Sequence, residues 1–287
     1  MMRRSALLVL FALLAVALLA CRGDSAPAVG NISTPTASGT SDPAASGAGL
    51  YIALGDSLSA GIGASSPDTT FVELVHQSLS PGIQLMNLGR SGDTSDDLIQ
   101  GGNLDRAVAM IESNNSDGNQ TNDVQLVTLE IGGNDLLGIY FSSVQTGLCP
   151  DVQTSLAKPE CTQALHDALD GFRPNFDTAL DKLQEAGPAV PIVVMTLYNP
   201  FDYFGAVGEL GVLSLDGKAG TDFPEGLNDI IRSVAADHPG VIVADVYSAF
   251  AGKTAGLISS DLIHPNDAGY GTMADAVVAA LGSASAP

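Results

Sequence analysis

Residues 50–61 read Leu50-Tyr51-Ile52-Ala53-Leu54-Gly55-Asp56-Ser57-Leu58-Ser59-Ala60-Gly61, an apolar run that passes directly into a glycine, an acid and a serine. The length of the run and its flanking glycines favour a buried strand over a helix. A serine on the tight turn after such a strand exposes its hydroxyl, as a nucleophile requires. Gly-Asp-Ser is also ordinary turn chemistry. The stretch therefore predicts a strand and one candidate nucleophile, Ser57.

Five apolar runs of this kind predict the strands of one sheet. They are Leu50–Leu54, Ile83–Leu88, Val124–Ile131, Val190–Leu197 and Val241–Val246. Each run is rich in Val, Ile and Leu instead of alternating with polar residues, which is typical of a sheet covered on both faces. Helical patterns lie between the runs: Phe71–Leu79, Leu98–Ile111, Cys161–Leu183, Leu227–Ala236 and Asp267–Leu281. Strands that alternate with helices predict an α/β fold, a three-layer α/β/α sandwich around a mainly parallel five-stranded sheet.

Two of these helical patterns contain residues that disfavour a helix. Gly101 and Gly102 interrupt the second pattern. Pro174 lies inside the third, where we expect it to kink or divide the helix. Pro265 and Asn266 give a start signal for the last helix.

Candidate functional residues follow the strands at their carboxyl ends, where open α/β sheets bind ligands. Ser57 follows the first strand, Gly89 the second and Asn134 the third, and His264 lies beyond the fifth. The backbone N–H of Gly89 and the side-chain amide of Asn134 are potential donors to a developing oxyanion. The alternatives are a plain turn at Gly89 and a helix cap by Asn134 or Asp135.

Asp261 and His264 have the spacing of an acid and the base that it orients. A carboxylate three residues before the ring can reach Nδ1 and leave Nε2 free to face Ser57. The remaining histidines, His76, His166 and His238, are interpreted as structural because each lies in a polar helical context without a nearby acid at useful spacing. Asp56 is interpreted as a turn-stabilising acid that points away from the site.

Four sequence blocks together resemble the GDSL, or SGNH, hydrolases. They are Gly55-Asp56-Ser57-Leu58, Leu88-Gly89-Arg90-Ser91-Gly92, Gly132-Gly133-Asn134-Asp135 and Asp261-x-x-His264-Pro265. The resemblance covers Leu50 to Leu281 and implies a flavodoxin-like sheet with strand order 2-1-3-4-5. It also implies a serine esterase with Ser57, His264 and Asp261 as the triad and with Ser57, Gly89 and Asn134 as the oxyanion hole. No cofactor is implied, and the expected partner is a small-molecule or lipid ester.

Several other functions compete with this interpretation. A flavin or nucleotide binder would need a phosphate loop after the first strand, and Gly61-Ile62-Gly63 has neither the third glycine nor the lysine of such loops. A catalytically silent surface binding protein would have no need of Ser57, Asn134, Asp261 and His264 together. Among esterases, a carbohydrate O-acetyl esterase competes with a lipase, lysophospholipase, thioesterase or short-chain esterase. The absence of Trp favours acyl or lipid esters slightly.

The first 20 residues predict a secretory signal peptide, with basic Arg3 and Arg4 before the apolar run Ala6–Ala20. The run is too short to span a bilayer comfortably, which takes about 20 residues. Its end, Leu18-Leu19-Ala20-Cys21, resembles the lipobox of bacterial lipoproteins. This resemblance implies cleavage before Cys21, acylation of that cysteine and an extracytoplasmic protein anchored in the bacterial cell membrane. The alternative is a simple secretory signal with an incidental cysteine.

Composition bounds the rest of the chain. In residues 22–48, 21 of the 27 residues are Ala, Gly, Ser, Thr or Pro, so we predict a flexible linker over residues 21–48. Residues 49–283 form the predicted hydrolase domain, which we expect to be a monomer. Removal of the signal leaves 9 basic and 32 acidic residues, a formal charge of −23 that disfavours nucleic acid as a partner. Cys149 and Cys161 predict a local disulfide in an oxidising compartment. No Cys-x-x-Cys or His-x-x-x-His spacing supports a metal site.

Overall fold

The molecule is built around one parallel sheet of five strands, seen in a computed structural model that describes residues 49–145, 154 and 156–284. The strands are β1 (Leu50–Gly55), β2 (Gln84–Asn87), β3 (Val124–Glu130), β4 (Ile192–Met195) and β5 (Val241–Ala244). Their order is β2-β1-β3-β4-β5, and all neighbours are parallel. The predicted α/β class and the strand order are confirmed.

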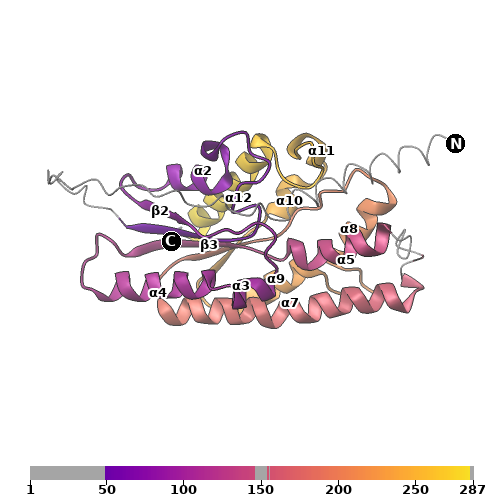
Figure 1. The fold of residues 1–287 in the computed structure, drawn as a ribbon, viewed down its shortest axis with the longest axis horizontal. Coiled ribbons are helices and arrows are strands. Elements are labelled where there is room, and N and C mark those ends of the chain that lie inside the picture. The colour runs from indigo at the N-terminus through magenta and orange to yellow at the C-terminus, as the bar shows by residue number, and fades with distance from the viewer. Residues whose placement is uncertain (1–48, 146–153, 155, 285–287) are drawn as a thin grey trace, which may run out of the picture.

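Helices cover both faces of the sheet and complete three layers (Figure 1). One layer holds α3 (Ser95–Gln100), α4 (Asn103–Ser116), α7 (Pro159–Ala186) and α9 (Leu227–Asp237). The opposite layer holds α2 (Phe71–Ser78), α10 (Val246–Phe250), α11 (Thr254–Leu257) and α12 (Asp267–Ala284). Near the carboxyl ends of the strands lie α5 (Gly133–Gln145) and α8 (Ala206–Asp216), and a 3-10 turn, Pro67–Thr69, precedes α2.

The apolar strands form two cores, one on each face of the sheet. In β1, Ile52 and Leu54 pack into the core under α4 and α7, whereas Tyr51 and Ala53 pack into the core under α2 and α12. This explains the continuous apolar run, since each fully buried side chain of this size contributes about 1.5–3 kcal/mol. The expectation of a sheet covered on both faces is confirmed, although β2 and β5 are partly exposed because they form the sheet edges.

The helix-breaking signals have different outcomes. Gly101 and Gly102 separate α3 from α4 as predicted, and Gly102 has a left-handed φ of 84°. Pro174 does not divide α7, which runs unbroken from Pro159 to Ala186. A proline inside a helix costs about 3 kcal/mol. The neighbouring rings of Phe172 and Phe176 are both buried and stack with centroids 5.3 Å apart, so packing along the core outweighs this cost.

Several expectations concern residues outside the described part of the chain. These are the signal peptide, Cys21, the linker and Cys149. Cys161 is buried in the first turn of α7, and its pairing with Cys149 stays a prediction. Within residues 49–145, 154 and 156–284, no helix combines the length and apolarity needed to cross a membrane.

Candidate active site

Ser57 lies on a tight turn directly after β1. Gly55 has a φ of 146°, and a Cβ at this position would collide with the carbonyl oxygen of Glu130 in β3, so only glycine fits. The turn is closed by the Asp56 side chain, whose Oδ1 accepts the N–H of Leu58 at 3.0 Å. Ser57 is therefore fixed at the carboxyl end of the sheet and is only 8% exposed.

The structure brings Ser57, His264 and Asp261 into one hydrogen-bonded row. His264 Nε2 lies 3.0 Å from Ser57 Oγ, and His264 Nδ1 lies 2.6 Å from Asp261 Oδ2. The other oxygen of Asp261 accepts three hydrogen bonds, from Ser259 Oγ at 2.8 Å and from the backbone N–H groups of Ile263 and His264 at 2.9 Å each. One carboxylate thus orients the ring and also shapes the loop that carries it.

The loop between Asp261 and His264 contains a strained residue. Leu262 has a φ of 67°, the only positive φ of a non-glycine residue in the described part of the chain. This conformation costs about 1–2 kcal/mol for a residue with a Cβ. The hydrogen bonds from Ile263 and His264 to Asp261 hold the turn in this conformation. Backbone strain of this kind is concentrated at functional sites.

The protonation states follow from these contacts. Burial alone would raise the pKa of Asp261, but hydrogen bonds from the His264 ring and from two backbone N–H groups outweigh burial and hold that pKa below its ordinary value. Asp261 is therefore an anion at neutral pH and can only accept at Nδ1. Neutral His264 then carries its proton on Nδ1, and its Nε2 can accept the proton of Ser57.

Gly89 lies beside the nucleophile turn, but its N–H already has an acceptor. The N–H donates to Asn87 Oδ1 at 2.9 Å, and Asn87 Nδ2 donates to the carbonyl of Ser59 at 2.7 Å. A Cβ at Gly89 would lie 2.6 Å from the Cβ of Ser59, so the close approach of the two loops requires glycine. Gly89 does not line the cavity that contains Ser57.

Asn134, at the start of α5, lines the same cavity as Ser57. Its Nδ2 donates to Asp56 Oδ2 at 3.1 Å and to the carbonyl of Asp93 at 2.9 Å, so both N–H groups have protein acceptors. The contact corrects one expectation. Asp56 stabilises the turn as predicted, but its carboxylate does not point away from the site, because it binds Asn134. The sequence places Asp56 before the nucleophile but does not show which neighbour its side chain meets.

An apolar cavity opens beside Ser57 and His264. Besides the predicted Ser57, Asn134 and His264, its walls come from the loop after β4, from the rest of α5 and from α8, which the sequence patterns do not predict as parts of the site. The apolar side chains lining it are Leu58, Leu136, Leu137, Leu197, Tyr198, Pro200, Phe201, Leu215 and Ile263. This lining suits the apolar part of a ligand, since ligand pockets are lined predominantly by hydrophobic side chains.

The profile of the GDSL-like lipase/acylhydrolase family matches residues 53–271, most of the chain and all four blocks around the site. This chain is a GDSL-like lipase/acylhydrolase. Membership makes it a serine ester hydrolase. The acylhydrolase is also 24% identical over 239 residues to the spore germination lipase LipC of Bacillus licheniformis, covering 80% of this chain and 95% of that protein.

Solved structures share the fold of the acylhydrolase. Lipase Lip_vut3 from a goat rumen metagenome is 21% identical with a TM-score of 0.56, and the match covers 80% of this chain and 96% of that one. A variant of Axe2, an acetyl xylan esterase from Geobacillus stearothermophilus, is 17% identical with a TM-score of 0.51, and covers 81% of this chain and 94% of that one. At these identities the likeness concerns the fold alone.

The other three histidines of the acylhydrolase lie outside the cavity. His166 stacks on Phe223 with ring centroids 4.2 Å apart. The expectation that they lack a nearby acid is wrong for two of them. His76 Nδ1 lies 3.3 Å from Glu73, and His238 Nε2 lies 2.8 Å from an aspartate of α7 that is distant in sequence. In the described ranges, no group of three or more His, Cys, Asp and Glu side chains could hold a metal ion.

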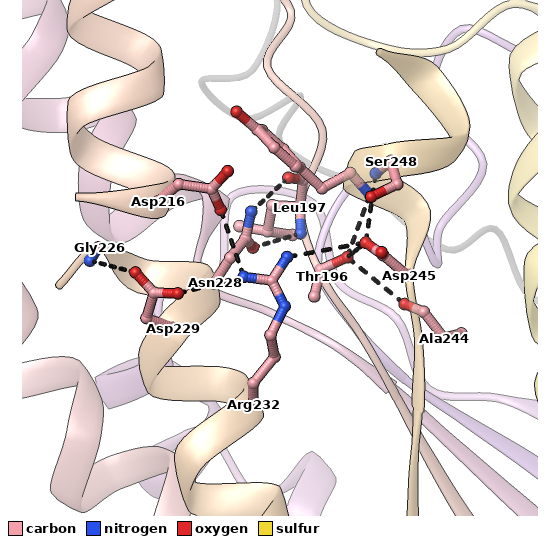
Figure 2. A network of polar contacts seen from close by, with 11 residues as sticks. Thr196, Leu197, Asp216, Gly226, Asn228, Asp229, Arg232, Ala244, Asp245 and Ser248 are labelled. Carbon is pink, nitrogen blue, oxygen red and sulfur yellow. Dashed lines mark hydrogen bonds and ion pairs between the residues drawn. The ribbon is translucent and has the colours of Figure 1, made fainter. Parts of the chain in front are cut away.

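The cavity wall at the end of β4 is tied to α9 (Figure 2). The N–H of Leu197 donates to Asn228 Oδ1 at 2.7 Å, and Asn228 Nδ2 donates back to the Leu197 carbonyl at 2.9 Å. One helical turn on, Arg232 forms ion pairs with Asp216 at 3.3 Å and with Asp245 at 3.7 Å. The amide of Asn228 therefore pairs with the backbone as a neighbouring strand would, and fixes the position of a cavity residue.

We expect Asn228→Ala to lower the free energy of unfolding of the acylhydrolase by about 2–4 kcal/mol. The substitution leaves the N–H and the carbonyl of Leu197 buried without partners, at about 1–3 kcal/mol for each group. Urea unfolding followed by circular dichroism measures the loss. Asn119→Ala, on an exposed loop, serves as the matched control and should change the value by less than about 0.5 kcal/mol. An Asn228→Ala protein as stable as its parent would contradict the role given to this amide.

Proposed function

We propose that this chain is a lipid-anchored extracytoplasmic esterase that hydrolyses carboxylic esters with an apolar acyl chain, as lipases, lysophospholipases and short-chain esterases do. Ser57 is the nucleophile, His264 the general base and acid, and Asp261 the residue that orients His264. The observation that carries the proposal is the row from Ser57 Oγ to His264 Nε2, 3.0 Å, and from His264 Nδ1 to Asp261 Oδ2, 2.6 Å, at the mouth of the apolar cavity.

The reaction proceeds in two halves through an acyl-enzyme. Ser57 Oγ attacks the ester carbonyl carbon while its proton passes to His264 Nε2, and the carbonyl oxygen becomes an oxyanion. Collapse of this intermediate breaks the bond to the alcohol, which leaves with the proton from His264. Water then attacks the acyl group with His264 as the base, and the acid departs from Ser57. Asp261 stabilises the imidazolium in both halves.

In this proposal the oxyanion binds to the backbone N–H groups of Ser57 and Gly89 and to the amide of Asn134. One such donor is typically worth about 3–4 kcal/mol in the transition state. The donors of Gly89 and Asn134 already have protein acceptors, Asn87 for the first and Asp56 and Asp93 for the second. The role therefore requires that the oxyanion share or replace these acceptors as its charge develops.

The apolar lining of the cavity supports an acyl chain as the group bound beside Ser57. Leu136 and Leu137 come from α5 and Leu215 comes from α8, so two helices form an apolar wall of the cavity next to the nucleophile. Each methylene that leaves water contributes about 0.8 kcal/mol, or about a fourfold gain in kcat/KM while the chain continues to fit. The curated relative from Bacillus licheniformis is named a lipase, which is consistent with this substrate class.

We expect kcat/KM for p-nitrophenyl esters to rise at least tenfold from acetyl to octanoyl. The series, from acetyl to palmitoyl, is measured beside acetylated xylan and a lysophospholipid. Activity confined to acetylated xylan would contradict the acyl-chain preference and favour a carbohydrate O-acetyl esterase. Absence of turnover on every ester would favour a binding protein on the same fold.

A substitution inside the cavity tests whether the cavity causes the chain-length preference. Ser214 of α8 lines the cavity, and Ser214→Phe should reduce turnover of the octanoyl ester far more than that of the acetyl ester. Ser283→Phe is the matched control, because Ser283 makes the same hydrogen bond to the carbonyl four residues before it but lies exposed at the end of α12. Equal losses of turnover on the octanoyl and acetyl esters would contradict the proposal that the acyl chain binds in the cavity.

The proposal places the enzyme on the bacterial cell membrane through acylated Cys21. We expect Cys21→Ser to move the protein from the membrane fraction to the soluble fraction. Stable anchoring needs more than one acyl chain, and Cys21 carries all of them in this proposal. Fractionation with immunodetection measures the change, and turnover of a soluble ester serves as the control for folding. A Cys21→Ser protein that stays in the membrane fraction after a high-salt wash would contradict the anchor.

A further inference from the structure

Glu130, the last residue of β3, has a buried carboxyl group that nothing in the proposed reaction uses. It is only 1% exposed, and it lines the cavity that contains Ser57. Among the described residues, neither carboxyl oxygen has an N–H or O–H donor. A buried carboxylate without donors costs several kcal/mol, so this side chain requires a specific explanation.

The group next to it is another carboxyl, that of Asp56. Gly55 pairs in register with Glu130, which brings the side chain of Asp56 beside that of Glu130 within hydrogen-bonding contact. Two carboxylates are both acceptors and cannot form such a bond unless one of them carries a proton. A pair of adjacent carboxyls in a buried site takes up one proton for the same reason that aspartic-protease dyads do.

The contacts decide which of the two carries the proton. Asp56 accepts the N–H of Leu58 at 3.0 Å and an N–H of Asn134 at 3.1 Å, and both bonds favour its charged form. The backbone N–H of Asp56 favours ionised Glu130, but it donates to the backbone carbonyl of Glu130 at 3.3 Å, and neither carboxyl oxygen has an N–H or O–H donor. Burial first, and the neighbouring charge of Asp56 second, raise the pKa of Glu130 well above its ordinary value.

The other titratable groups around the pair do not change this assignment. Tyr198 and Tyr270 donate their hydroxyls to backbone carbonyls, at 2.7 and 2.6 Å, and not to Glu130. Asp261 is bound to His264, and the positive charge that forms on the His264 ring during the reaction favours ionised Asp56.

We propose that Glu130 is a neutral carboxylic acid that donates a hydrogen bond to anionic Asp56 and is thereby a positioning residue for Asn134 and the nucleophile turn. The inference rests on the proposed function, since its effect on the reaction passes through Asn134. The proton limits the pair to one negative charge. Ionisation of Glu130 would place a second charge near the developing oxyanion, and activity should therefore fall as Glu130 loses its proton at alkaline pH.

The test compares three variants over pH 6–10 with a p-nitrophenyl ester. Glu130→Met removes the donor at similar size and should lower kcat by about 10- to 100-fold with little change in KM, because it displaces Asn134 whereas removal of a catalytic donor costs about 10²- to 10³-fold. Glu130→Gln can still donate to Asp56 but cannot ionise, so it should rescue most of the kcat lost in Glu130→Met and should lack the alkaline decline of the parent. Glu112→Gln, exposed on α4, should keep the parent's profile.

Two outcomes would overturn the inference. One is a folded Glu130→Gln protein as slow as Glu130→Met at pH 7, and the other is an alkaline decline in Glu130→Gln at the same pH as in the parent.

Two measurements do not depend on turnover, so they distinguish failure of this inference from failure of the proposed function. The infrared spectrum at pH 7 should contain the carbonyl band of a protonated, buried carboxylic acid, and Glu130→Gln should lack it. Folded Glu130 keeps its proton at pH values where the unfolded chain releases it, so the parent loses stability as pH rises. The difference in Tm between Glu130→Gln and the parent should therefore grow from pH 5 to pH 9. A missing band, or a constant difference in Tm, would show that Glu130 is ionised and contradict the inference.

Discussion

Ser57→Ala should lower kcat for ester hydrolysis by about 10⁴- to 10⁶-fold, the range seen when the nucleophile of a serine hydrolase is removed. The reason is geometric. Ser57 Oγ is the hydroxyl that His264 Nε2 meets, at 3.0 Å, in the cavity that would bind the acyl chain. Without it no acyl-enzyme forms. Turnover of p-nitrophenyl octanoate by freshly purified protein measures the loss.

Ser91→Ala provides the matched control for this variant. Ser91 belongs to the Gly89 block and is exposed. We expect activity near that of the parent. The Ser57→Ala protein should unfold at a similar temperature to the parent, so that a loss of activity cannot be ascribed to unfolding. A folded Ser57→Ala protein with more than about 1% of the parent's activity would contradict the role of Ser57.

Asp261→Asn should lower kcat by about 10³- to 10⁴-fold, the second-largest effect expected. The oxygen of the new amide can still accept the hydrogen bonds of Ser259, Ile263 and His264, so the loop should keep its shape. The NH₂ group then faces His264 Nδ1. Nδ1 must then become an acceptor, and the ring proton moves to Nε2. A protonated Nε2 cannot accept the proton of Ser57. The predicted loss thus comes from the wrong tautomer and from an unstabilised imidazolium.

Kinetics at saturating ester test this prediction, because the loss should fall on kcat and leave KM nearly unchanged. Asp245→Asn is the matched control. Asp245 also accepts hydrogen bonds, from Ser248 N in α10 and from Thr196 Oγ1 after β4, but it lies outside the cavity. We expect it to reduce stability and leave kcat within about threefold. Equal losses of kcat in both variants would show that Asp261 acts through stability alone.

The sequence predicts most of the sheet because the apolar composition of each central strand can be recognised without knowing its neighbours. The runs of β1 and β3 are apolar throughout, and both faces of each strand are buried. The edge positions of β2 and β5 are not visible in composition, since they depend on strand order. Pro174 shows the same limit. Local propensity predicts a broken helix, and the burial of Phe172 and Phe176 keeps α7 continuous.

The candidate site divides in the same way. Asp261 and His264 are three residues apart, so their contact is a local property. Ser57 is expected at the same edge of the sheet because functional residues of open α/β sheets lie at the carboxyl ends of the strands. The partners of Asn134, which are Asp56 and Asp93, lie far away in the sequence, so no local spacing identifies them. The acid pair of Asp56 and Glu130 depends on the register of β1 against β3. The cavity walls come from α5 and α8, whose apolar residues give no clear helical face in the sequence.

Active-site labelling tests the central claim most directly. The purified protein is treated with a fluorophosphonate, and intact mass and peptide mapping locate the adduct. We predict one phosphonyl group, attached to Ser57, and no adduct on Ser57→Ala or His264→Ala protein. An adduct on another residue, or undiminished labelling of Ser57→Ala, would contradict the assignment of Ser57 and His264 as nucleophile and base.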